Sequence, residues 1–512
     1  MALKEALAWA EDKQLSDLDY RFLKASQQLT QQKTEQNLLR AEIEREKAQF
    51  ALFAVKEANR ILAIARQNAH QKIKQLRLSP RWLSLVAIAV ALFTILLRLT
   101  GGLQGLELTA LDLYFQQRRA ELDSRITMIT IDETDIQNIG QFPLSDLILA
   151  RSLDNLIRYQ PRVIGLNLYR DLPVPPGNEL LQQLLKTTPN LIGIEKVVGA
   201  KISPPPLLAK SNRVGFADRI FDDDGAIRRA LLSIRDDNGI EYSFALRLVL
   251  EYLQAENITP QPLANTASHI QLGKTILIPF QPNDGGYVRA DAGGYQTLID
   301  YRGTLDRFTH YSLSALLADR IPEEVLRDRL ILIGSTAATM GDLSLTPYSR
   351  WKSTIGNQMA GVTIEANIIS QLLSAALDRE SMLRTSSPVR EALYLLLAAG
   401  VGAFWGWWLR SFWHRAIAIS CTVIATILIT YLTFLQGWWL PVIPMAIALI
   451  VAAMGIVIVT QRQLATMQLK ETVKHLIVIS RSQLIVRNIA LELLKQGESP
   501  KDRELIEKFI SH

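Results

Sequence analysis

The chain has 512 residues, of which 48% are hydrophobic and 21% charged, and its formal net charge is +6 at pH 7. Its one cysteine, Cys421, excludes an intrachain disulfide, and six scattered histidines offer no zinc-site spacing, so we expect no metal and no cofactor. The basic balance is accompanied by no nucleic-acid recognition motif, and we therefore expect no nucleic acid among the partners.

The first segment, residues 1–81, is predicted to be a cytoplasmic helical linker or stalk. Residues 1–79 contain neither glycine nor proline, and Ser16 with Asp19 forms a capping-box pattern that predicts a helix start. A helix of this length needs packing to be stable. Small and apolar residues recur at a spacing of three and four, at Ala51, Ala54, Ala58, Ile61 and Ala65. This spacing suits a close contact between helices in a homodimer or with a signalling partner; the alternative is a solvated linker.

Four apolar runs are long enough to cross a bilayer core of about 30 Å. The first, residues 82–99, lies too far along the chain for a cleavable signal peptide, although a buried helix of a soluble domain is an alternative. The other three are residues 391–409, 416–436 and 439–460. Tryptophans near their ends are typical of an interfacial belt, at Trp405, Trp407, Trp408, Trp438 and Trp439.

Basic residues near the helix ends predict the orientation. They precede the first run, separate the second from the third, and follow the fourth, at Lys72, Lys74, Arg77, Arg81, Arg410, Arg415, Arg462, Lys470 and Lys474. Both termini are therefore expected in the cytoplasm of a bacterium, with the chain in the inner (plasma) membrane and residues 101–388 outside. Arg98 and Arg390 depart from this rule mildly, and both can reach the interface.

Residues 101–388 are predicted to form an α/β domain. Short apolar strands alternate with amphipathic helices, with strands near 126–131, 163–168, 191–198 and 330–334 and helices near 144–160, 178–187 and 362–377. This alternation predicts a mostly parallel sheet covered by helices. The middle, residues 213–310, instead carries the hairpin signals Asp224-Gly225 and Gly285-Gly286, which predict an antiparallel insertion.

Polar residues stand where the predicted strands end, and that edge is where open α/β sheets bind ligands. The candidate ligand-binding residues are Asp132, Asp135, Asn167, Asp171, Ser335, Thr336 and Asp342. Turn chemistry or helix capping is the alternative explanation for each. The run Asp222-Asp223-Asp224-Gly225 is interpreted as a plain turn because it lacks the last glutamate of a calcium loop. No catalytic residue is predicted, since neither His269 nor His310 lies near a nucleophile motif.

The last segment, residues 461–512, is predicted to be a helical cytoplasmic tail. Ser499-Pro500 with Asp502 indicates a fresh helix start after Gly497. The segment is too short for a kinase, cyclase or phosphatase domain, so we expect no enzymatic output in this chain.

Several stretches of the outside domain resemble the type-2 CHASE domain, a cyclase/histidine-kinase-associated sensory extracellular module of bacteria. They are Leu111-Asp112-Leu113-Tyr114-Phe115 with Arg118-Arg119, Ile129–Glu133, Val214–Asp218 leading to Asp224-Gly225 and Arg228-Arg229, Leu298–Gly303, Leu332–Ala337 with Asp342 and Thr346-Pro347, and Ala360–Asn367. Their order, with one membrane helix before and three after, is the specific part of the resemblance. Two positions depart from the family: Asn167 replaces a usual aspartate, and residues 140–146 lack an arginine.

The resemblance implies reception of a signal outside the cytoplasm. We therefore expect a membrane-bound sensory receptor whose outside domain binds an unknown ligand and relays the signal to a cytoplasmic partner, or within a homodimer, through residues 1–79 or 461–512. The lipid bilayer is the other expected partner. A membrane-tethered extracytoplasmic enzyme and a scaffold of an envelope assembly are the alternatives.

Overall fold

The structure is a computed structural model that describes Glu5, Ala8 and residues 16–73, 79–236, 239–263, 266–349, 358–378, 382–479 and 484–510. The predicted helix beyond Ile73 and the basic residues Lys74 and Arg77 lie outside the described residues. Two compact units make up the chain, one of Met1–Trp82 with Val457–His512 and one of Leu83–Ile456. Each unit is described by itself.

The first unit is helical. It contains α2 (Asp17–Ile73), the last part of α14 (Val442–Ile479), α15 (Leu484–Gln496) and α16 (Pro500–Ile510). The predicted helix starts are present: the backbone N–H of Asp19 donates to Ser16 Oγ over 3.4 Å, and that of Asp502 donates to Ser499 Oγ over the same distance. The helix α14 does not stop at Thr460, because no glycine or proline follows Gly455 until Gly497.

The alanine-rich face of α2 is covered within the chain. Ala58, Leu62 and Ala65 are buried in one cluster with residues of the other three helices, among them Val473, Leu476, Ala490, Leu494 and Ile506. Lys72 Nζ forms an ion pair with Glu471 Oε2 over 2.7 Å. The close helix contact that the alanine spacing indicates therefore forms between helices of the same chain.

The second unit is built on a six-stranded sheet in which every neighbouring pair is parallel. In spatial order the strands are β11 (Phe308–Ser312), β1 (Asp123–Ile131), β12 (Leu330–Ser335), β2 (Val163–Asn167), β3 (Leu191–Glu195) and β4 (Val214–Phe216). Their burial is nearly continuous, so both faces must be covered. The prediction of a mostly parallel sheet is confirmed.

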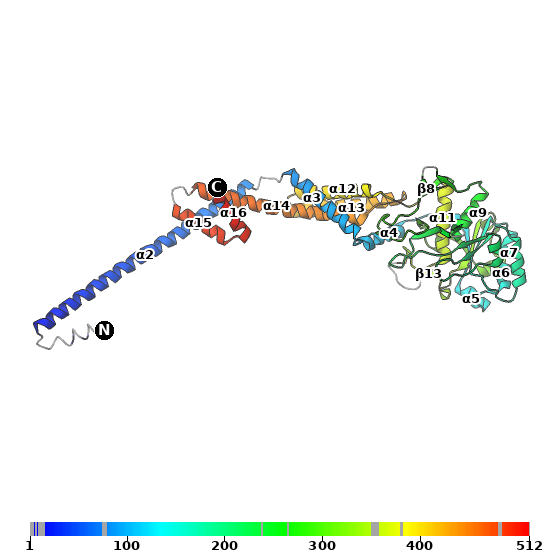
Figure 1. The fold of residues 1–512 in the computed structure, drawn as a ribbon, viewed down its shortest axis with the longest axis horizontal. Helices are drawn as coiled ribbons and strands as arrows, with labels where there is room; N and C mark the ends of the chain where they lie inside the picture. Colours follow the sequence, from blue (N-terminus) through cyan, green and yellow to red (C-terminus); the bar gives the residue numbers. More distant parts are fainter. Residues whose placement is uncertain are drawn as a thin grey trace. The chain divides into compact units, whose positions relative to one another are not determined.

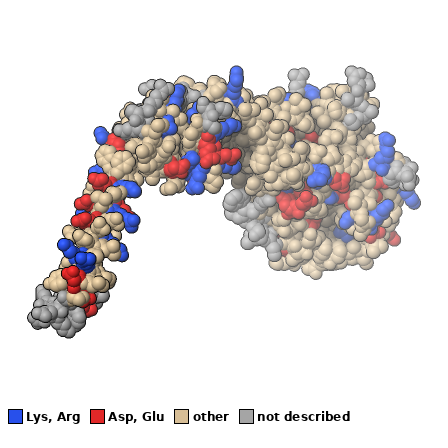
Figure 2. Space-filling model, turned by 60° about the vertical axis from the view of Figure 1, so that its left-hand side comes forward, with Lys and Arg blue, Asp and Glu red and all other residues tan. Residues whose placement is uncertain are grey.

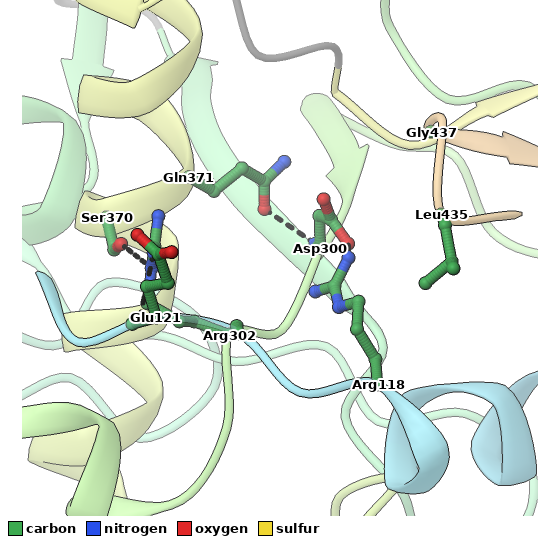
Figure 3. Close-up of a pocket in the computed structure, with 9 residues that line it drawn as sticks. Arg118, Glu121, Asp300, Arg302, Ser370, Gln371, Leu435 and Gly437 are labelled. Atoms are coloured by element: carbon green, nitrogen blue, oxygen red, sulfur yellow. Dashed lines mark hydrogen bonds and ion pairs between the residues drawn. The ribbon is translucent and has the colours of Figure 1, made fainter.

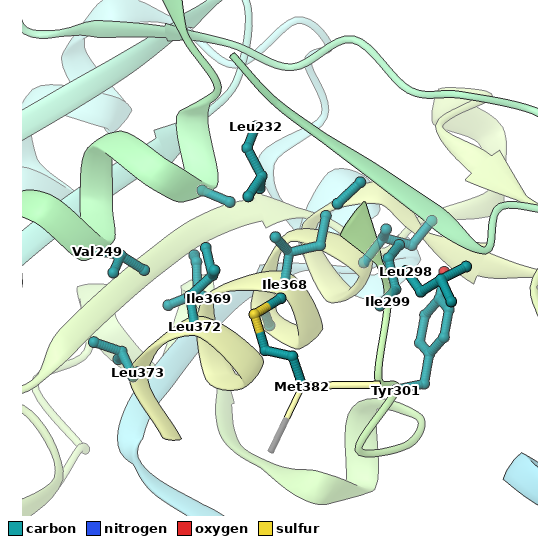
Figure 4. Close-up of a cluster of buried hydrophobic side chains, with 14 of the residues drawn as sticks. Leu232, Val249, Leu298, Ile299, Tyr301, Ile368, Ile369, Leu372, Leu373 and Met382 are labelled. Carbon is teal, nitrogen blue, oxygen red and sulfur yellow. The ribbon is translucent and has the colours of Figure 1, made fainter. Parts of the chain in front are cut away.

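Helices cover both faces of this sheet (Figure 1). One face packs on α6 (Asp146–Arg158), α7 (Asn178–Thr187), α8 (Pro206–Lys210) and α10 (Leu313–Leu317). The other packs on α9 (Phe244–Gln254) and α11 (Gly361–Asp378). A Cβ at Gly165 would lie 2.9 Å from the Phe244 ring, so α9 can lie directly on β2 only because residue 165 is glycine. Figure 4 shows the same core between α11 and Leu298 to Tyr301.

The middle of the domain forms two small antiparallel sheets, as predicted. One contains β5 (Arg229–Asp236), β6 (Gly239–Tyr242) and β10 (Tyr295–Leu298), and the other β7 (Gln261–Leu263), β8 (Thr266–Leu272) and β9 (Thr275–Leu277). Gly285-Gly286 is not a hairpin turn, which corrects the prediction. A Cβ at Gly285 would lie 2.2 Å from the Trp439 ring, so this glycine serves a close approach.

Short elements complete the domain. They are α4 (Gln104–Gln117), α5 (Glu133–Ile139), three 3₁₀ turns (Leu305–Arg307, Glu323–Val325, Ala338–Met340), and the strand pairs β13 (Leu343–Ser344) with β14 (Met359–Ala360) and β15 (Arg384–Thr385) with β16 (Trp438–Trp439).

Four helices of the described chain are long and apolar enough to cross a membrane: α3 (Pro80–Leu99), α12 (Pro388–Trp408), α13 (Phe412–Phe434) and α14. Within the second unit, α3, α12 and α14 share a cluster rich in alanine, including Ala91, Ala399 and Ala452. Gly402 and Gly406 let α12 approach α14 closely, since a Cβ at Gly402 would lie 2.0 Å from the Leu449 carbonyl oxygen. Small residues at such spacing are typical of packing between membrane helices.

Candidate functional site

A cavity of about 590 Å³ opens at the carboxyl edge of β2, β3 and β4. Asn167 ends β2, Lys196 follows β3, and Asp218 and Arg219 come shortly after β4. Because neighbouring parallel strands end at the same edge, residues far apart in the sequence line one cavity. Asp342 and Tyr169 complete its polar wall.

A bidentate ion pair crosses this cavity wall. Arg219 Nη1 lies 2.6 Å from Asp342 Oδ1, and Nη2 lies 3.1 Å from Oδ2. The pair lies against the first residue of α11, where a Cβ on Gly361 would lie 1.7 Å from Arg219 Nη2. Glycine at this position is therefore needed for the guanidinium to occupy its place.

Glu365, one turn further along α11, lies behind the ion pair and is buried. Burial raises the pKa of its carboxyl to about 7, with Arg219 opposing and Asp342 adding to the shift. This edge of the domain therefore holds a carboxyl group that titrates near neutral pH.

Two buried donors at the cavity have no hydrogen-bond partner among the described residues: Asn167 Nδ2 and Arg219 Nε. The Asn167 residue is only 7% exposed. Leaving a buried donor unpaired costs about 1–3 kcal/mol, and such groups are uncommon in folded proteins. Both atoms are closed off from solvent, so an acceptor oxygen of a molecule in the cavity would reach them only after the wall shifts.

Lys196 adds a positive charge to the same cavity. It has no acidic partner within ion-pair distance among the residues that the structure describes. Its segment is held in place because the Asp218 carboxylate accepts the backbone N–H groups of Val197 over 2.9 Å and Val198 over 3.0 Å.

Of the seven candidate residues predicted from the sequence, this cavity is lined by Asn167 and Asp342. Asp132 caps α5, and buried Asp135 accepts the backbone N–H groups of Leu313 and Ser314 over 3.1 and 2.9 Å. The Ser335 hydroxyl donates to the Ile131 carbonyl oxygen over 3.2 Å. Asp171 is exposed, and Thr336 is half-buried. Capping thus accounts for Asp132 and Asp135 without a ligand.

The sequence reasoning missed Arg219 and Lys196. Arg219 stands directly after the Val214–Asp218 stretch, so its place beside that motif was the available signal. Nothing in the sequence pairs it with Asp342, which lies more than a hundred residues further along the chain.

A second polar region, which we name the joint, connects α4 to the antiparallel sheet and to the apolar helices α13 and α14. Its centre is Arg228, which is 1% exposed. Arg228 Nε and Nη2 bind Asp112 of α4 over 2.7 and 2.8 Å, and Nη1 binds Asp222 over 2.9 Å. Asp224 accepts from the same guanidinium over 2.8 Å. The aspartate run that was interpreted as a turn therefore also supplies carboxylates to this network.

The joint reaches the ends of the apolar helices α13 and α14. Glu107 of α4 accepts the backbone N–H groups of Val442 and Ile443, the first residues of α14, over 3.1 and 2.9 Å. Tyr114 Oη lies 2.7 Å from Thr430 Oγ1 of α13. A carboxylate at a helix N-terminus is favourable because the unpaired N–H groups there carry partial positive charge.

Trp439 is not an interfacial belt residue, which corrects the prediction. It is 1% exposed, its indole Nε1 donates to Glu107 Oε1 over 3.3 Å, and its ring meets Tyr287 edge to face. Trp438 and Trp439 also pair as β16 with β15, the segment that leads from the domain into α12.

Between the domain and the end of α13 lies a smaller cavity of about 360 Å³, shown in Figure 3. Arg118 points to Asp300, with Nη1 2.6 Å from Oδ1, while Gln371 of α11 accepts the Asp300 backbone N–H over 2.8 Å. Arg302 Nε donates to Ser370 Oγ over 2.8 Å. Leu435 and Gly437 close the other side. Helix α11 thus lines this cavity with Ser370 and Gln371, and its first residue, Gly361, donates its backbone N–H to the carbonyl oxygen of Asp342 in the wall of the carboxyl-edge cavity.

Comparison with known proteins places the chain in a family. A family model described as the CHASE2 domain matches residues 87–404. No curated protein and no solved structure is matched. The match runs over more than half of the chain and includes α11, Arg228 with its aspartates, and the residues that line the carboxyl-edge cavity, whereas α13 and α14 lie beyond it. The chain therefore belongs to the CHASE2 domain family, a family of sensory extracellular domains.

Proposed function

We propose that this chain is a membrane-bound sensory receptor whose α/β domain binds a small polar molecule in the carboxyl-edge cavity. The observation that carries the proposal is the unpaired amide of Asn167, buried in the wall of a cavity of about 590 Å³. Family membership supports a sensory role, and the four apolar helices fit a membrane protein.

The cavity favours a ligand that offers acceptor oxygens. The donors in its wall are the Asn167 amide N–H, the Arg219 Nε–H and the Lys196 ammonium, and they lie beside the carboxylates of Asp218, Asp291 and Asp342. Carboxylate, phosphate and hydroxyl oxygens of a ligand match these donors. We therefore propose a small oxygen-rich ligand, neutral or anionic.

Helix α11 is the proposed relay. Its first turn lies against the Arg219–Asp342 pair, and its later residues Ser370 and Gln371 line the cavity beside α13. A ligand that shifts Arg219 would press on Gly361 and displace a packed helix, and small helix shifts are an established way to carry a signal. The joint would pass the displacement on to α13 and α14.

We further propose that residues 101–388 lie outside the cytoplasm of a bacterium, that both termini lie inside, and that the chain has no catalytic output. A cytoplasmic partner would then receive the signal through residues 1–79 or 461–512. Reporter fusions should report an outside location at residues 200 and 437 and an inside location at residues 40, 412 and 480. An inside location at residue 200 would overturn this topology.

Ligand binding can be tested on the full-length protein in lipid nanodiscs. Thermal unfolding is followed with acetate, inorganic phosphate, an amino-acid mixture and a neutral sugar as probes. A probe should raise the unfolding temperature of the wild type and of Arg158→Ala, an exposed arginine on α6, but not of Arg219→Ala. A shift that survives Arg219→Ala would move the site elsewhere, and chemical conversion of the probe would favour the membrane-tethered enzyme.

A further inference from the structure

The first half of α2 carries large apolar side chains that no described residue covers. Leu18 is 81% exposed, Phe22 74% and Leu39 59%, and Phe50 and Phe53 are 58% and 62% exposed. A helix this long is not stable without packing, and contiguous exposed apolar surface marks a contact site.

These side chains form a single stripe. Positions alternate in steps of four and three along residues 18–53, through Leu18, Phe22, Ala25, Leu29, Gln32, Gln36, Leu39, Ile43, Glu46, Phe50 and Phe53. Alternating steps of four and three are the a and d pattern of a coiled coil, here sustained for about five heptads. We call these positions the heptad stripe.

The second half of α2 already has a partner, on a different face of the helix from the heptad stripe. After Phe53 the buried residues are Ala54, Ala58, Leu62, Ala65 and Ala69, whereas the heptad spacing would continue at Glu57 and Arg60. There α14 and α15 of the same chain cover the helix. Among the described residues, the chain therefore supplies a partner for the second half of α2 and none for the first half.

We propose that a second copy of this chain covers the heptad stripe, as a parallel, in-register coiled coil over residues 18–53. This inference stands on α2 alone and does not depend on the ligand site. It also moves the predicted dimer contact from the alanine face to residues nearer the N-terminus.

The charges flanking the heptad stripe favour parallel pairing with an identical helix. In that arrangement Glu35 faces Arg40 of the partner copy, and Glu42 faces Lys47 of the partner copy, as g and e positions of successive heptads. An antiparallel pair would set the acidic edge around Glu35 and Glu42 against its own copy. Figure 2 shows the alternation of acidic and basic side chains along this helix.

The polar residues of the heptad stripe fit an in-register homodimer as well. Gln32 and Gln36 would each meet their own counterpart, and amide side chains can both donate and accept. Glu46 would also meet its counterpart, and two carboxylates there weaken the pairing. The dimer is therefore expected to be of moderate affinity, and Glu46→Leu should strengthen it.

Cysteine crosslinking of the full chain in membranes tests the contact, on a Cys421→Ser background with an added oxidant. Leu39→Cys should crosslink, whereas Leu38→Cys, a neighbouring leucine of nearly equal exposure on another face, should crosslink at least about fivefold less. Equal crosslinking at both positions would overturn the proposal.

The ends of the heptad stripe report orientation. Leu18→Cys and Phe53→Cys should each crosslink to the same residue of the partner copy only if the helices are parallel, because antiparallel helices separate these positions by about 50 Å. Crosslinks at Leu39→Cys without any at the two ends would contradict the parallel arrangement.

Affinity gives the second readout, with purified full-length protein in detergent. Ile43→Glu should raise the dissociation constant by about tenfold or more, since it buries like charges, and Glu46→Leu should lower it by a similar factor. Unchanged association in both variants would overturn the proposal. So would a Leu39→Cys crosslink that forms in cells only with a different protein.

Discussion

Arg228 and Arg219 lie in the same domain but differ in how many carboxylates bind their guanidinium groups. Arg228, in the joint, is held by the carboxylates of Asp112, Asp222 and Asp224. Arg219, at the carboxyl-edge cavity, pairs among the described residues with the carboxylate of Asp342 alone, and its Nε has no partner among them. One region satisfies its buried charge completely, and the other leaves donors open.

This difference indicates a structural role for the joint and a binding role for the carboxyl-edge cavity. A buried arginine saturated by carboxylates has one arrangement, so the joint holds α4 rigidly to the antiparallel sheet, beside the ends of the apolar helices α13 and α14. A donor without a partner is a cost to the folded state that a bound molecule can remove. The comparison predicts that mutations in the two regions change stability by different amounts and even with different signs.

The largest effect is expected in the joint. Arg228→Met removes the guanidinium that binds the carboxylates of Asp112, Asp222 and Asp224, two of them nearly inaccessible to solvent, and should lower the free energy of unfolding by about 3–5 kcal/mol. Thermal unfolding of the full-length protein in detergent measures the loss. The control Arg158→Met removes an exposed ion pair with Asp154 and should cost less than about 1 kcal/mol. Equal losses would mean that the joint is not a structural anchor.

A smaller effect with a defined pH dependence is expected at Glu365. Its pKa of about 7 exceeds the ordinary value of 4.5, so the unfolded chain releases this proton at lower pH than the folded domain does. The contribution of Glu365 to the free energy of unfolding therefore falls as the pH rises from about 4.5 to 7, and it does not change further above pH 7. Glu365→Gln should stabilise the protein by about 3 kcal/mol at pH 8 and leave it unchanged at pH 4.

The matched control for that experiment is Glu323→Gln, whose side chain is half-exposed and pairs with Arg327 on the surface. It should show little difference between the two pH values. A Glu365→Gln variant that is destabilised at pH 8 would show instead that the carboxylate is ionised and held by Arg219.

The sheet could be predicted because its signals are local. Runs such as Ile126–Ile131 and Leu330–Gly334 are apolar throughout, and a strand buried on both faces needs nothing else to be recognised. The position of Asn167 at a strand end was likewise visible, and the cavity indeed forms there.

The rest depended on contacts between distant residues. Asp135 looked like a site residue because it follows a strand. Its carboxylate instead caps α10, which begins 178 residues further along the chain. Trp439 looked like a belt residue because it ends an apolar run, yet Glu107 and Tyr287 bury it. Alanine spacing on α2 correctly indicated a close helix contact, and only the structure shows that the partner is in the same chain.

The smallest effect, a stabilisation like that of Glu365→Gln, is expected at Asn167. Its amide is buried without a partner, so Asn167→Leu replaces an unpaired polar group with an apolar one of similar size. Removing that desolvation penalty should raise the free energy of unfolding of the ligand-free protein by about 1 kcal/mol. The same variant should lose the thermal shift produced by a binding probe.

Asn190 provides the matched comparison because its amide donates to the carbonyl oxygens of Pro161 and Arg162 over 2.8 and 3.2 Å. Asn190→Leu leaves those oxygens without their donor and should lower the free energy of unfolding by about 1–2 kcal/mol. Thermal unfolding of both variants in the same detergent gives the contrast directly. If Asn167→Leu destabilises the protein as much as Asn190→Leu does, the Asn167 amide has a structural partner. That result would contradict the proposal that the carboxyl-edge cavity is the binding site.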